Sequence, residues 1–490
     1  MDTSVNDLPE ESSLIDDGMG DKAEHLIARI AAKEAKIGIV GLGYVGLPLA
    51  FELASQGFQT LGIDVNGERV DQLNSGENFN EDLDDAAVQR VVEEGLLSAE
   101  TTYDRADDID VFFICVPTPI NDHKDPDTSY IEAAARSIAD HLRPGQLVVL
   151  KSTTHPNTTE KVVRPILEGK AEKRGLVLGD DYFLAFSPER IDPGNPNYDT
   201  SNTPVVVGGV TETCTKAARF AISQIVDQVH PVSNPGVAEM EKLLENIFRS
   251  VNIALVNELA QLCDRMGDIS IWEVVEAAAT KPFGYMPFYP GPGLGGHCIP
   301  VDPHYLSWLA REHDFETSFI TLSARVNESM PFYVTNAVVE AVAERPVCLQ
   351  DARVLILGVA FKKNVDDTRR SPAHTVVRLL RERGIDQIHF ADPHVDQFQV
   401  PTQEDKTVDL PRTELSSETL GDYDVAVLLT DHDDFQYGKI AEHGPAIIDT
   451  RDGFAGVHDE HDDIWVLGGG GRRVSRGSTD TTPENSRART

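Results

Sequence analysis

The stretch from Gly291 to Asp302 places a cysteine in a setting that favours nucleophilic chemistry. It reads Gly-Pro-Gly-Leu-Gly-Gly-His-Cys-Ile-Pro-Val-Asp, with four glycines in its first six residues. Cys298 stands where the next residues could begin a helix, and a thiol at a helix N-terminus has a lowered pKa and is partly thiolate. Asp302 falls on the same face if the helix has started, as a candidate base or water ligand. His297 is a rival base, although a capping role in the loop is favoured for it.

A second motif indicates a dinucleotide site. Gly41-Leu-Gly-Tyr-Val-Gly46 follows an apolar strand and opens a helix, so Gly41, Gly43, Tyr44, Val45 and Gly46 are candidate cofactor-binding residues. The next strand ends in Asp64, eighteen residues after Gly46, where a carboxylate can accept hydrogen bonds from ribose hydroxyls and repels a 2′-phosphate. NAD is therefore predicted over NADP. Arg69 either weakens that preference from the following helix or is simply solvated.

A nicotinamide cofactor combined with an activated cysteine predicts a particular reaction. Oxidation of a primary alcohol gives an aldehyde, which a thiolate converts to a thiohemiacetal. Loss of a second hydride gives a thioester, and water then releases an acid. The sequence thus predicts a four-electron oxidation that uses two NAD per turnover.

Six motifs in this order carry a resemblance to the nucleotide-sugar dehydrogenases, the family of UDP-glucose, UDP-N-acetylhexosamine and GDP-mannose 6-dehydrogenases. The resemblance spans residues 36 to about 460. The motifs are the glycine loop at 41–46, Val116-Pro-Thr-Pro, the segment from Ser152 to Glu160, the segment from Lys242 to Asn246, the cysteine loop, and the segment from Gly358 to Pro372. The resemblance implies an N-terminal NAD domain, a central helical domain that forms a homodimer, and a C-terminal domain that closes over a UDP-sugar.

The resemblance also implies roles for individual residues. Cys298 would form the thioester, and Lys242 and Asn246, four apart on a helix, would stabilise the oxyanion and contact the substrate. Asp302 and Thr118 would hold the catalytic water, and Glu160 would be the base for thioester hydrolysis. The remaining implied contacts are Thr118, Thr153 and Arg369 to NAD, and Arg190, Lys362 and Gly295 to the substrate. Without the family match, Lys242, Asn246 and Glu160 would be interpreted as surface residues.

Two departures from the family's pattern lead to further predictions. Pro156-Asn157 replaces the more common Pro-Gly, but asparagine tolerates left-handed dihedral angles, so the turn is expected to remain. The C-terminal α/β segment has Gly358-Val-Ala-Phe-Lys in place of a second GxGxxG motif. It is therefore not expected to bind a second NAD.

The identity of the sugar is predicted from two segments. Ser187-Pro-Glu-Arg190-Ile-Asp-Pro-Gly-Asn195 resembles the enzymes for UDP-N-acetylhexosamines, and residues 280–293 resemble those for UDP-N-acetylglucosamine. Arg190 and the aromatic residues Phe283, Tyr285, Phe288 and Tyr289 could frame the acetamido group and the diphosphate; otherwise the aromatic residues belong to a core. UDP-N-acetylglucosamine is favoured, followed by UDP-N-acetylmannosamine and then UDP-glucose.

Alternating strands and helices place these motifs in an α/β fold with parallel sheets. The expected organisation is an acidic N-terminal extension at 1–33, a Rossmann NAD domain at 34–230, a central helical domain with the cysteine loop at 231–345, a Rossmann-like UDP-sugar domain at 346–468, and a disordered tail at 469–490. Long helices are expected between about Val237 and Val342, where apolar residues recur every three to four positions.

Composition limits the possible partners. The 490 residues include 81 Asp and Glu against 43 Lys and Arg, a net charge of −38, so nucleic acid and anionic membranes are not expected partners. The polar, acidic N-terminus predicts a cytoplasmic protein without a secretory signal. Five widely spaced cysteines suggest reduced thiols and no metal site. Because the acid excess is spread along the chain, we also hypothesise adaptation to high salt, where ordinary acidic solubility is the alternative.

Two other classes of protein compete with this interpretation. A two-electron NAD-dependent hydroxyacid dehydrogenase of similar architecture would need no cysteine. A non-catalytic protein that binds sugar nucleotides would be expected to lack Cys298 or Lys242, and neither is missing.

Overall fold

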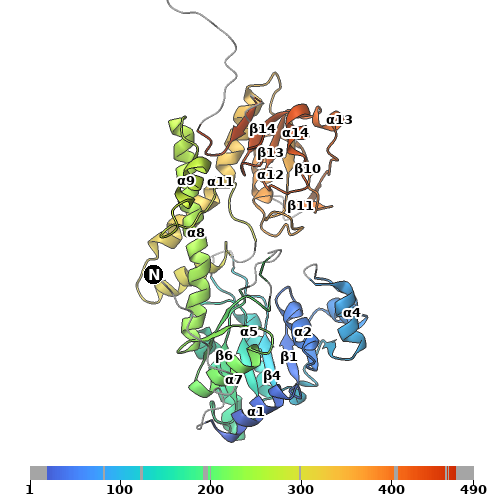
Figure 1. Cartoon of the computed structure of the whole chain (residues 1–490), viewed down its shortest axis with the longest axis vertical. Helices are drawn as coiled ribbons and strands as arrows, with labels where there is room; N and C mark the ends of the chain where they lie inside the picture. The colour runs from blue at the N-terminus through green and yellow to red at the C-terminus, as the bar shows by residue number, and fades with distance from the viewer. Residues whose placement is uncertain are drawn as a thin grey trace, which may run out of the picture. The chain divides into compact units, whose positions relative to one another are not determined.

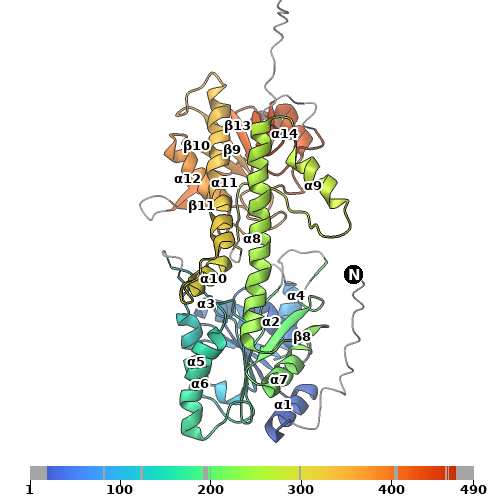
Figure 2. The same cartoon turned by 90° about the vertical axis from the view of Figure 1, so that its left-hand side faces the viewer.

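The computed structural model describes residues 19–80, 83–121, 125–190, 197–198, 200–296, 299–401, 407–457, 461 and 463–470. These residues form two compact units, one of residues up to Ile247 together with Val301–Thr317, the other of Phe248–Pro300 together with Ser318 onward. The helices that we assigned to one central domain are therefore divided between two units. The longest of them, α8 (Pro235–Met266), contributes to both (Figure 2).

An eight-stranded sheet forms the centre of the first unit, in the order β3-β2-β1-β4-β5-β6-β7-β8 (Figure 1). All neighbouring strands are parallel except β6 and β7. The strands are β1 (Ile37–Val40), β2 (Thr60–Ile63), β3 (Leu97–Glu100), β4 (Val111–Ile114), β5 (Leu147–Leu150), β6 (Phe183–Phe186), β7 (Val205–Gly209) and β8 (Val229–Pro231). The predicted parallel α/β fold is confirmed.

Helices cover both faces of this sheet because successive strand residues point to opposite sides. On β4, Phe113 packs with α1, α2 and α7, whereas Phe112 packs with α5 and α6. Figure 2 shows α5 and α6 on one side and α1 and α7 on the other. The helices are α1 (Asp21–Ala31), α2 (Gly46–Ser55), α3 (Gly67–Asn74), α4 (Asp85–Glu93), α5 (Ser129–Asp140), α6 (Arg164–Ala171), α7 (Glu212–Ile222) and α10 (Asp302–Arg311).

The position of α1 corrects the proposed domain boundary at residue 34. Ala23, Leu26, Ile27 and Ile30 lie in the hydrophobic core shared with α7, so this helix is part of the first unit and not of an extension outside it. Residues 1–18 lie outside the described part of the chain.

The second unit contains a smaller parallel sheet with the order β10-β9-β13-β14-β15. Its strands are β9 (Arg353–Leu357), β10 (Gln387–Ala391), β13 (Val425–Leu428), β14 (Ala446–Asp449) and β15 (Ile464–Val466), and β11 (Phe398–Pro401) pairs with β12 (Thr407–Leu410) in a separate antiparallel hairpin. Its helices are α9 (Ile271–Ala279), α11 (Ser318–Ala343), α12 (Pro372–Glu382), α13 (Ser417–Leu420) and α14 (Tyr437–His443). The predicted tail at 469–490 falls almost entirely outside the described residues; only Gly469 and Gly470 are described, and Gly470 packs against Ile269.

Sequence reasoning missed five short strands, namely β3, β8, β11, β12 and β15. They contain three or four residues, and all except β15 carry polar residues or proline, as in Leu97-Ser-Ala-Glu and Val229-His-Pro. Such strands lie at sheet edges or in a hairpin, where one face stays open to solvent and a long apolar run is not needed.

Candidate functional site

The glycine loop after β1 has the geometry of a phosphate-binding turn. Gly41 has φ +92, and a Cβ there would lie 2.7 Å from the Cys115 carbonyl oxygen. At Gly46 a Cβ would lie 1.8 Å from the Gly41 carbonyl oxygen, so this glycine lets α2 approach the strand. At Gly43 no atom lies within 4 Å of a Cβ, which leaves room for a ligand against the backbone. The three glycines thus fit the three roles that a dinucleotide loop requires.

The residues between the last two glycines begin the helix. Val45 is the N-cap of α2, and its carbonyl accepts from the Leu49 N–H. No side chain caps this helix end, and its first turn carries no acidic residue. The positive end of the helix dipole therefore favours an anion beside Tyr44 and Val45.

Asp64 is buried directly after β2. One carboxylate oxygen accepts from the Leu42 N–H of the glycine loop at 2.7 Å and the other from the Asn66 N–H at 2.8 Å. The carboxylate thus fixes the loop and still has acceptor capacity for ribose hydroxyls. Arg69 lies 4.0 Å from the same carboxylate, a distance at which it partly offsets the negative charge.

Thr118 and Thr153 meet where the loops after β4 and β5 come together. The Thr118 hydroxyl donates to the Thr153 carbonyl at 2.7 Å, and the Tyr305 hydroxyl of α10 donates to the Thr118 carbonyl. Since the carboxyl ends of parallel strands share one edge of a sheet, these residues lie on the same edge as the glycine loop.

Lys242, Asn246 and Asp302 form a buried polar group between α8 and α10. They are 8%, 6% and 3% exposed, and the Asn246 amide donates to an Asp302 carboxylate oxygen at 2.5 Å. Burial raises the pKa of Asp302 to about 7, while the Lys242 charge and the Asn246 hydrogen bond act in the opposite direction. An ammonium, an amide and a carboxyl with a pKa near neutrality are thus held together away from water, which is typical of catalytic sites.

The cysteine loop itself is described only in part. His297 and Cys298 lie outside the described residues, whereas α10 begins at Asp302. Asp302 is thus the first residue of the helix, so the condition for a shared helix face, that the helix has already started at Cys298, is not met.

The glycine-rich part of that loop packs within the second unit. A Cβ on Gly295 would lie 2.6 Å from the Phe361 Cβ, and the Gly296 N–H donates to the Arg369 carbonyl at 3.1 Å. The loop therefore lies against the segment that carries Lys362 and Arg369. The Arg369 guanidinium donates to the Asp367 carboxylate at 2.6–3.0 Å, so in this structure its charge is already paired.

Asn157 and Glu160 occupy the turn after β5. Asn157 has φ +70, which confirms the prediction that asparagine keeps the left-handed turn. Glu160 lies in a short π-helical turn (Thr159–Val163) and is half-buried. The fully buried carboxylate beside this turn is Glu239 of α8.

Arg190 contacts α8. Its guanidinium donates to the carboxylates of Glu241 and Glu245 and to the Pro204 carbonyl. In this structure Arg190 holds the segment after β6 against α8, the helix that carries Lys242.

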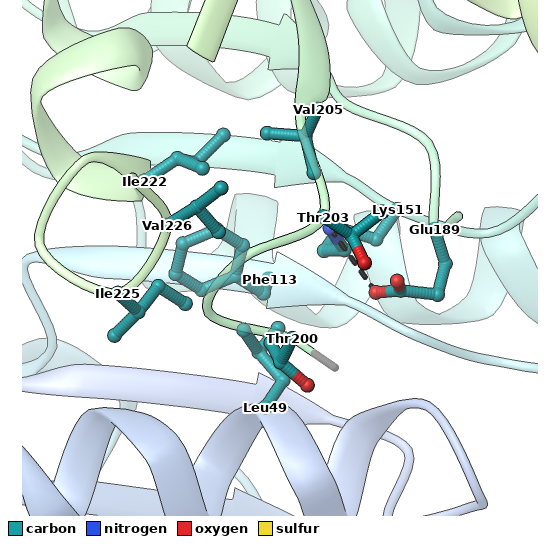
Figure 3. A pocket seen from close by; sticks show the side chains of 10 residues that line it. All are labelled: Leu49, Phe113, Lys151, Glu189, Thr200, Thr203, Val205, Ile222, Ile225 and Val226. Carbon is teal, nitrogen blue, oxygen red and sulfur yellow. Dashed lines mark ion pairs between the residues drawn. The ribbon is translucent and has the colours of Figure 1, made fainter. Parts of the chain in front are cut away.

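A small pocket in the first unit contains an ion pair of a buried lysine and a half-buried glutamate that sequence reasoning missed (Figure 3). Lys151 Nζ lies 3.4 Å from a Glu189 carboxylate oxygen, where β5 and β6 end. Figure 3 shows this pair opposite the apolar side chains of Phe113, Ile225 and Val226. The available signal was a lysine directly after one buried strand and a glutamate three residues after the next.

The aromatic residues that were predicted to surround the acetamido group are mostly exposed. Phe283, Tyr285 and Tyr289 are exposed, so the alternative that they belong to a core was wrong for these three. Phe288 packs against Phe248 with ring centroids 5.7 Å apart. Three aromatic side chains are therefore available to a ligand or to another chain.

In the second parallel sheet, as in the first, a glycine follows one strand and an aspartate follows the neighbouring strand. Gly358 has φ +76, and Asp392 accepts from the N–H groups of Val359, His394 and Val395 and contacts His432 Nε2 at 3.1 Å. The Asp392 carboxylate is therefore held by main-chain donors and a histidine of its own unit. That this domain binds no second NAD stays a prediction.

Other features bear on chemistry within the described residues. Cys115, Cys214, Cys263 and Cys348 are free thiols, and no three or more metal-binding side chains gather in the described part of the chain. None of the described helices combines the length and the apolar character needed to cross a membrane.

Comparison with known families agrees with this geometry. Residues 35–226 match the NAD-binding domain of the UDP-glucose/GDP-mannose dehydrogenase family, residues 236–329 its central domain, and residues 355–455 its UDP-binding domain. The chain belongs to this family of nucleotide-sugar dehydrogenases. It is therefore an NAD-dependent oxidoreductase, as the cysteine and glycine motifs predicted.

Individual relatives are similar over nearly their whole length. A UDP-N-acetyl-D-glucosamine 6-dehydrogenase of Pseudomonas aeruginosa is 36% identical over 405 residues, which cover 82% of this chain and 92% of the relative. A UDP-N-acetyl-D-mannosamine dehydrogenase of Escherichia coli K12 is 36% identical over 413 residues, with coverages of 82% and 94%. The solved structure of a UDP-D-ManNAc dehydrogenase from Pyrococcus horikoshii superposes with a TM-score of 0.77 at 31% identity, covering 88% of this chain and 99% of that one.

Proposed function

We propose that this protein oxidises the C6 alcohol of a UDP-N-acetylhexosamine to the uronic acid. The observation that carries the proposal is the buried group of Lys242, Asn246 and Asp302, held in the same unit as a glycine loop that fits NAD. The glycine loop would hold NAD, which would supply the oxidising equivalents, with two NAD used per sugar and one hydride passed to each. One water is consumed, and its oxygen remains in the acid.

In this proposal the protein carries the covalent intermediates on Cys298. The thiolate attacks the aldehyde to form a thiohemiacetal, whose oxidation gives a thioester. Lys242 and Asn246 stabilise the oxyanion; Asn246 uses one amide hydrogen on Asp302 and keeps the second for this task. Asp302 and Thr118 hold the water, and Glu160 takes its proton.

For the sugar, we infer UDP-N-acetylglucosamine first and UDP-N-acetylmannosamine second. The segments at 187–195 and 280–293 support this order, and the exposed Phe283, Tyr285 and Tyr289 can contact an acetamido group. Relatives with either substrate in their names are equally identical to this chain, so overall identity does not separate the two epimers. Lys362, Arg369, Gly295 and Arg190 remain proposed contacts to substrate and cofactor.

We also propose a homodimer that forms through α8, in a protein of the cytoplasm. An exposed apolar stripe runs along this helix with spacings of three, four and seven residues, made of Met240, Leu244, Phe248, Leu255, Leu259, Leu262 and Met266. A stripe of this kind on a soluble helix usually packs against another apolar surface.

The test is a panel of UDP-sugars with NAD or NADP, in which NADH yield and product are measured together. We expect two NADH per sugar and a uronic acid from a UDP-N-acetylhexosamine, with NAD strongly preferred. Cys298→Ser is expected to abolish the second oxidation. If the serine variant still forms two NADH per sugar at the normal rate, the mechanism is wrong, and a two-electron hydroxyacid dehydrogenase becomes the better description.

A further inference from the structure

Glu239 is a buried carboxylate that the proposed mechanism does not use. It lies in the first turns of α8 and is 0% exposed. One oxygen accepts from the Asn157 N–H at 2.5 Å, and the other accepts from the Thr159 N–H at 2.8 Å and the Thr159 hydroxyl at 2.7 Å. All three donors belong to the turn after β5, so a single side chain of α8 holds this turn.

The turn and the helix each carry proposed functional residues close to this contact. Thr153 precedes the turn and Glu160 follows it directly. On α8, Lys242 and Asn246 lie three and seven residues after Glu239, a spacing that places all three on one face of the helix. The carboxylate is thus the link between two sets of groups that the reaction needs at a fixed separation.

The contact leaves little freedom to either partner. Asn157 already has a left-handed φ of +70, and a Cβ on Gly236 would lie 2.8 Å from the Asn157 side-chain oxygen. The turn therefore rests directly on the start of α8. A displaced turn would have to break main-chain hydrogen bonds inside the protein, which is costly without water to replace them.

A buried carboxylate has a large desolvation penalty. Burial raises the pKa of Glu239 to about 7, the hydrogen bonds from Thr159 and Asn157 act against this shift, and the charge of Glu160 adds to it. A purely structural contact could use a neutral side chain at lower desolvation cost. What glutamate offers is two oxygens that accept two main-chain N–H groups in fixed directions.

We propose that Glu239 is a positioning residue, which fixes the segment from Thr153 to Glu160 against the helix face that carries Lys242 and Asn246. This inference rests on the proposed function, because it concerns the distance between the groups assigned there. Glu239 itself touches neither substrate nor cofactor in this assignment and acts through the turn.

The decisive variant is Glu239→Gln, which keeps the size of the side chain but offers a single acceptor oxygen. Its amide nitrogen would face a main-chain N–H, so one end of the turn is released. We expect kcat to fall about 10- to 100-fold, since small displacements of catalytic groups have effects of this size. The KM for the UDP-sugar is expected to change less than about threefold, because its proposed contacts lie outside the released turn.

Two further measurements separate positioning from folding and from the proposed function. Amide hydrogen exchange at Asn157 and Thr159 is expected to accelerate in Glu239→Gln, a result that needs no substrate. Glu24→Gln on α1 removes the same charge from an exposed site and should leave exchange and kcat unchanged. If the wild type oxidises no UDP-sugar, the proposed function fails, whereas the exchange result still reports on the turn.

The inference is overturned if Glu239→Gln melts near the wild-type temperature and keeps the wild-type kcat. It is also overturned if KM rises while kcat stays unchanged. Should this variant not fold, Thr159→Val decides, because it removes only the hydroxyl donor. A several-fold loss of kcat in that protein supports positioning, and an unchanged kcat contradicts it.

Discussion

The side-chain amide of Asn246 donates a hydrogen bond to the carboxylate of Asp302 across 2.5 Å, although the two residues are 56 positions apart. This bond joins α8 to the first residue of α10. Around it lie the apolar side chains of Leu243, Val301 and Tyr305, which exclude water. The polar group is therefore held inside a small hydrophobic cluster, where its charges interact strongly.

The first prediction concerns Asp302 and pH. Its pKa is about 7 in the folded protein against an ordinary value of 3.8, so the folded protein retains a proton that the unfolded chain has lost between these values. The stabilisation from this group is complete below about pH 4 and is lost as the pH rises through 7. Asp302→Asn removes this dependence, so its unfolding free energy relative to wild type should rise between pH 4 and 7, by at most about 4 kcal/mol.

Chemical denaturation at a series of pH values measures this difference. Asp71→Asn on the exposed face of α3 is the matched control and should show almost no trend. A difference between Asp302→Asn and wild type that is flat from pH 4 to 8 would contradict the assigned pKa.

The second prediction separates two glycines of the same loop. Gly46→Ala places a Cβ 1.8 Å from the Gly41 carbonyl oxygen, so we expect a loss of about 2 kcal/mol in stability together with loss of NAD binding. Gly43→Ala meets no protein atom, so the melting temperature should hold while NAD affinity falls about tenfold or more. Calorimetric titration with NAD and thermal melting check both variants. Normal NAD binding by Gly43→Ala would mean that the pyrophosphate does not approach this position.

The third prediction tests which carboxylate is the base for thioester hydrolysis. Glu160→Gln is expected to form both NADH of the first turnover normally and to slow complete turnover about 100-fold, because the thioester waits for hydrolysis. Glu189 is the competing carboxylate, since it lies three residues after β6 and pairs with Lys151. Rapid-quench detection of the thioester in Glu160→Gln and Glu189→Gln decides between them. Accumulation in Glu189→Gln alone would assign the role to Glu189.

The fourth prediction concerns the apolar stripe of α8. Leu255→Glu combined with Leu262→Glu places two charges on this stripe, and we expect the protein to become monomeric because burying a carboxylate in an apolar interface is unfavourable. Sedimentation velocity measures the change. Val177→Glu, an exposed apolar site elsewhere, should leave the association state unchanged. A double variant that sediments as the wild type does would show that the stripe is not the interface.

The fifth prediction concerns salt. With a net charge of −38, self-repulsion should destabilise the fold at low ionic strength, and KCl should relieve it as the Debye length falls from about 10 Å at 0.1 M to about 3 Å at 1 M. We expect the melting temperature to rise between 0.1 and 3 M KCl. A melting temperature that does not rise would contradict adaptation to high salt, and the acid excess would then only keep the protein soluble.

Much of the fold and of the cofactor site could be predicted from local sequence. The glycine spacing at 41–46, the strand before it and Asp64 after it lie within one βαβ unit, where neighbouring residues determine the geometry. The left-handed turn at Asn157 was predictable for the same reason, because the preference belongs to the residue itself. The apolar strands followed from short apolar runs bounded by turns, and α8 followed from its helical periodicity.

The partners of charged side chains, in contrast, are determined only by the tertiary structure. The sequence contains Glu239, Asp302, Arg190 and Lys151, but their environments depend on which distant segments pack against them. Glu239 is 80 residues from the Thr159 that it binds, and Arg190 is 55 residues from Glu245. Burial and long-range hydrogen bonds determine whether such a group is solvated, paired or shifted in pKa, and both arise only when the chain has folded.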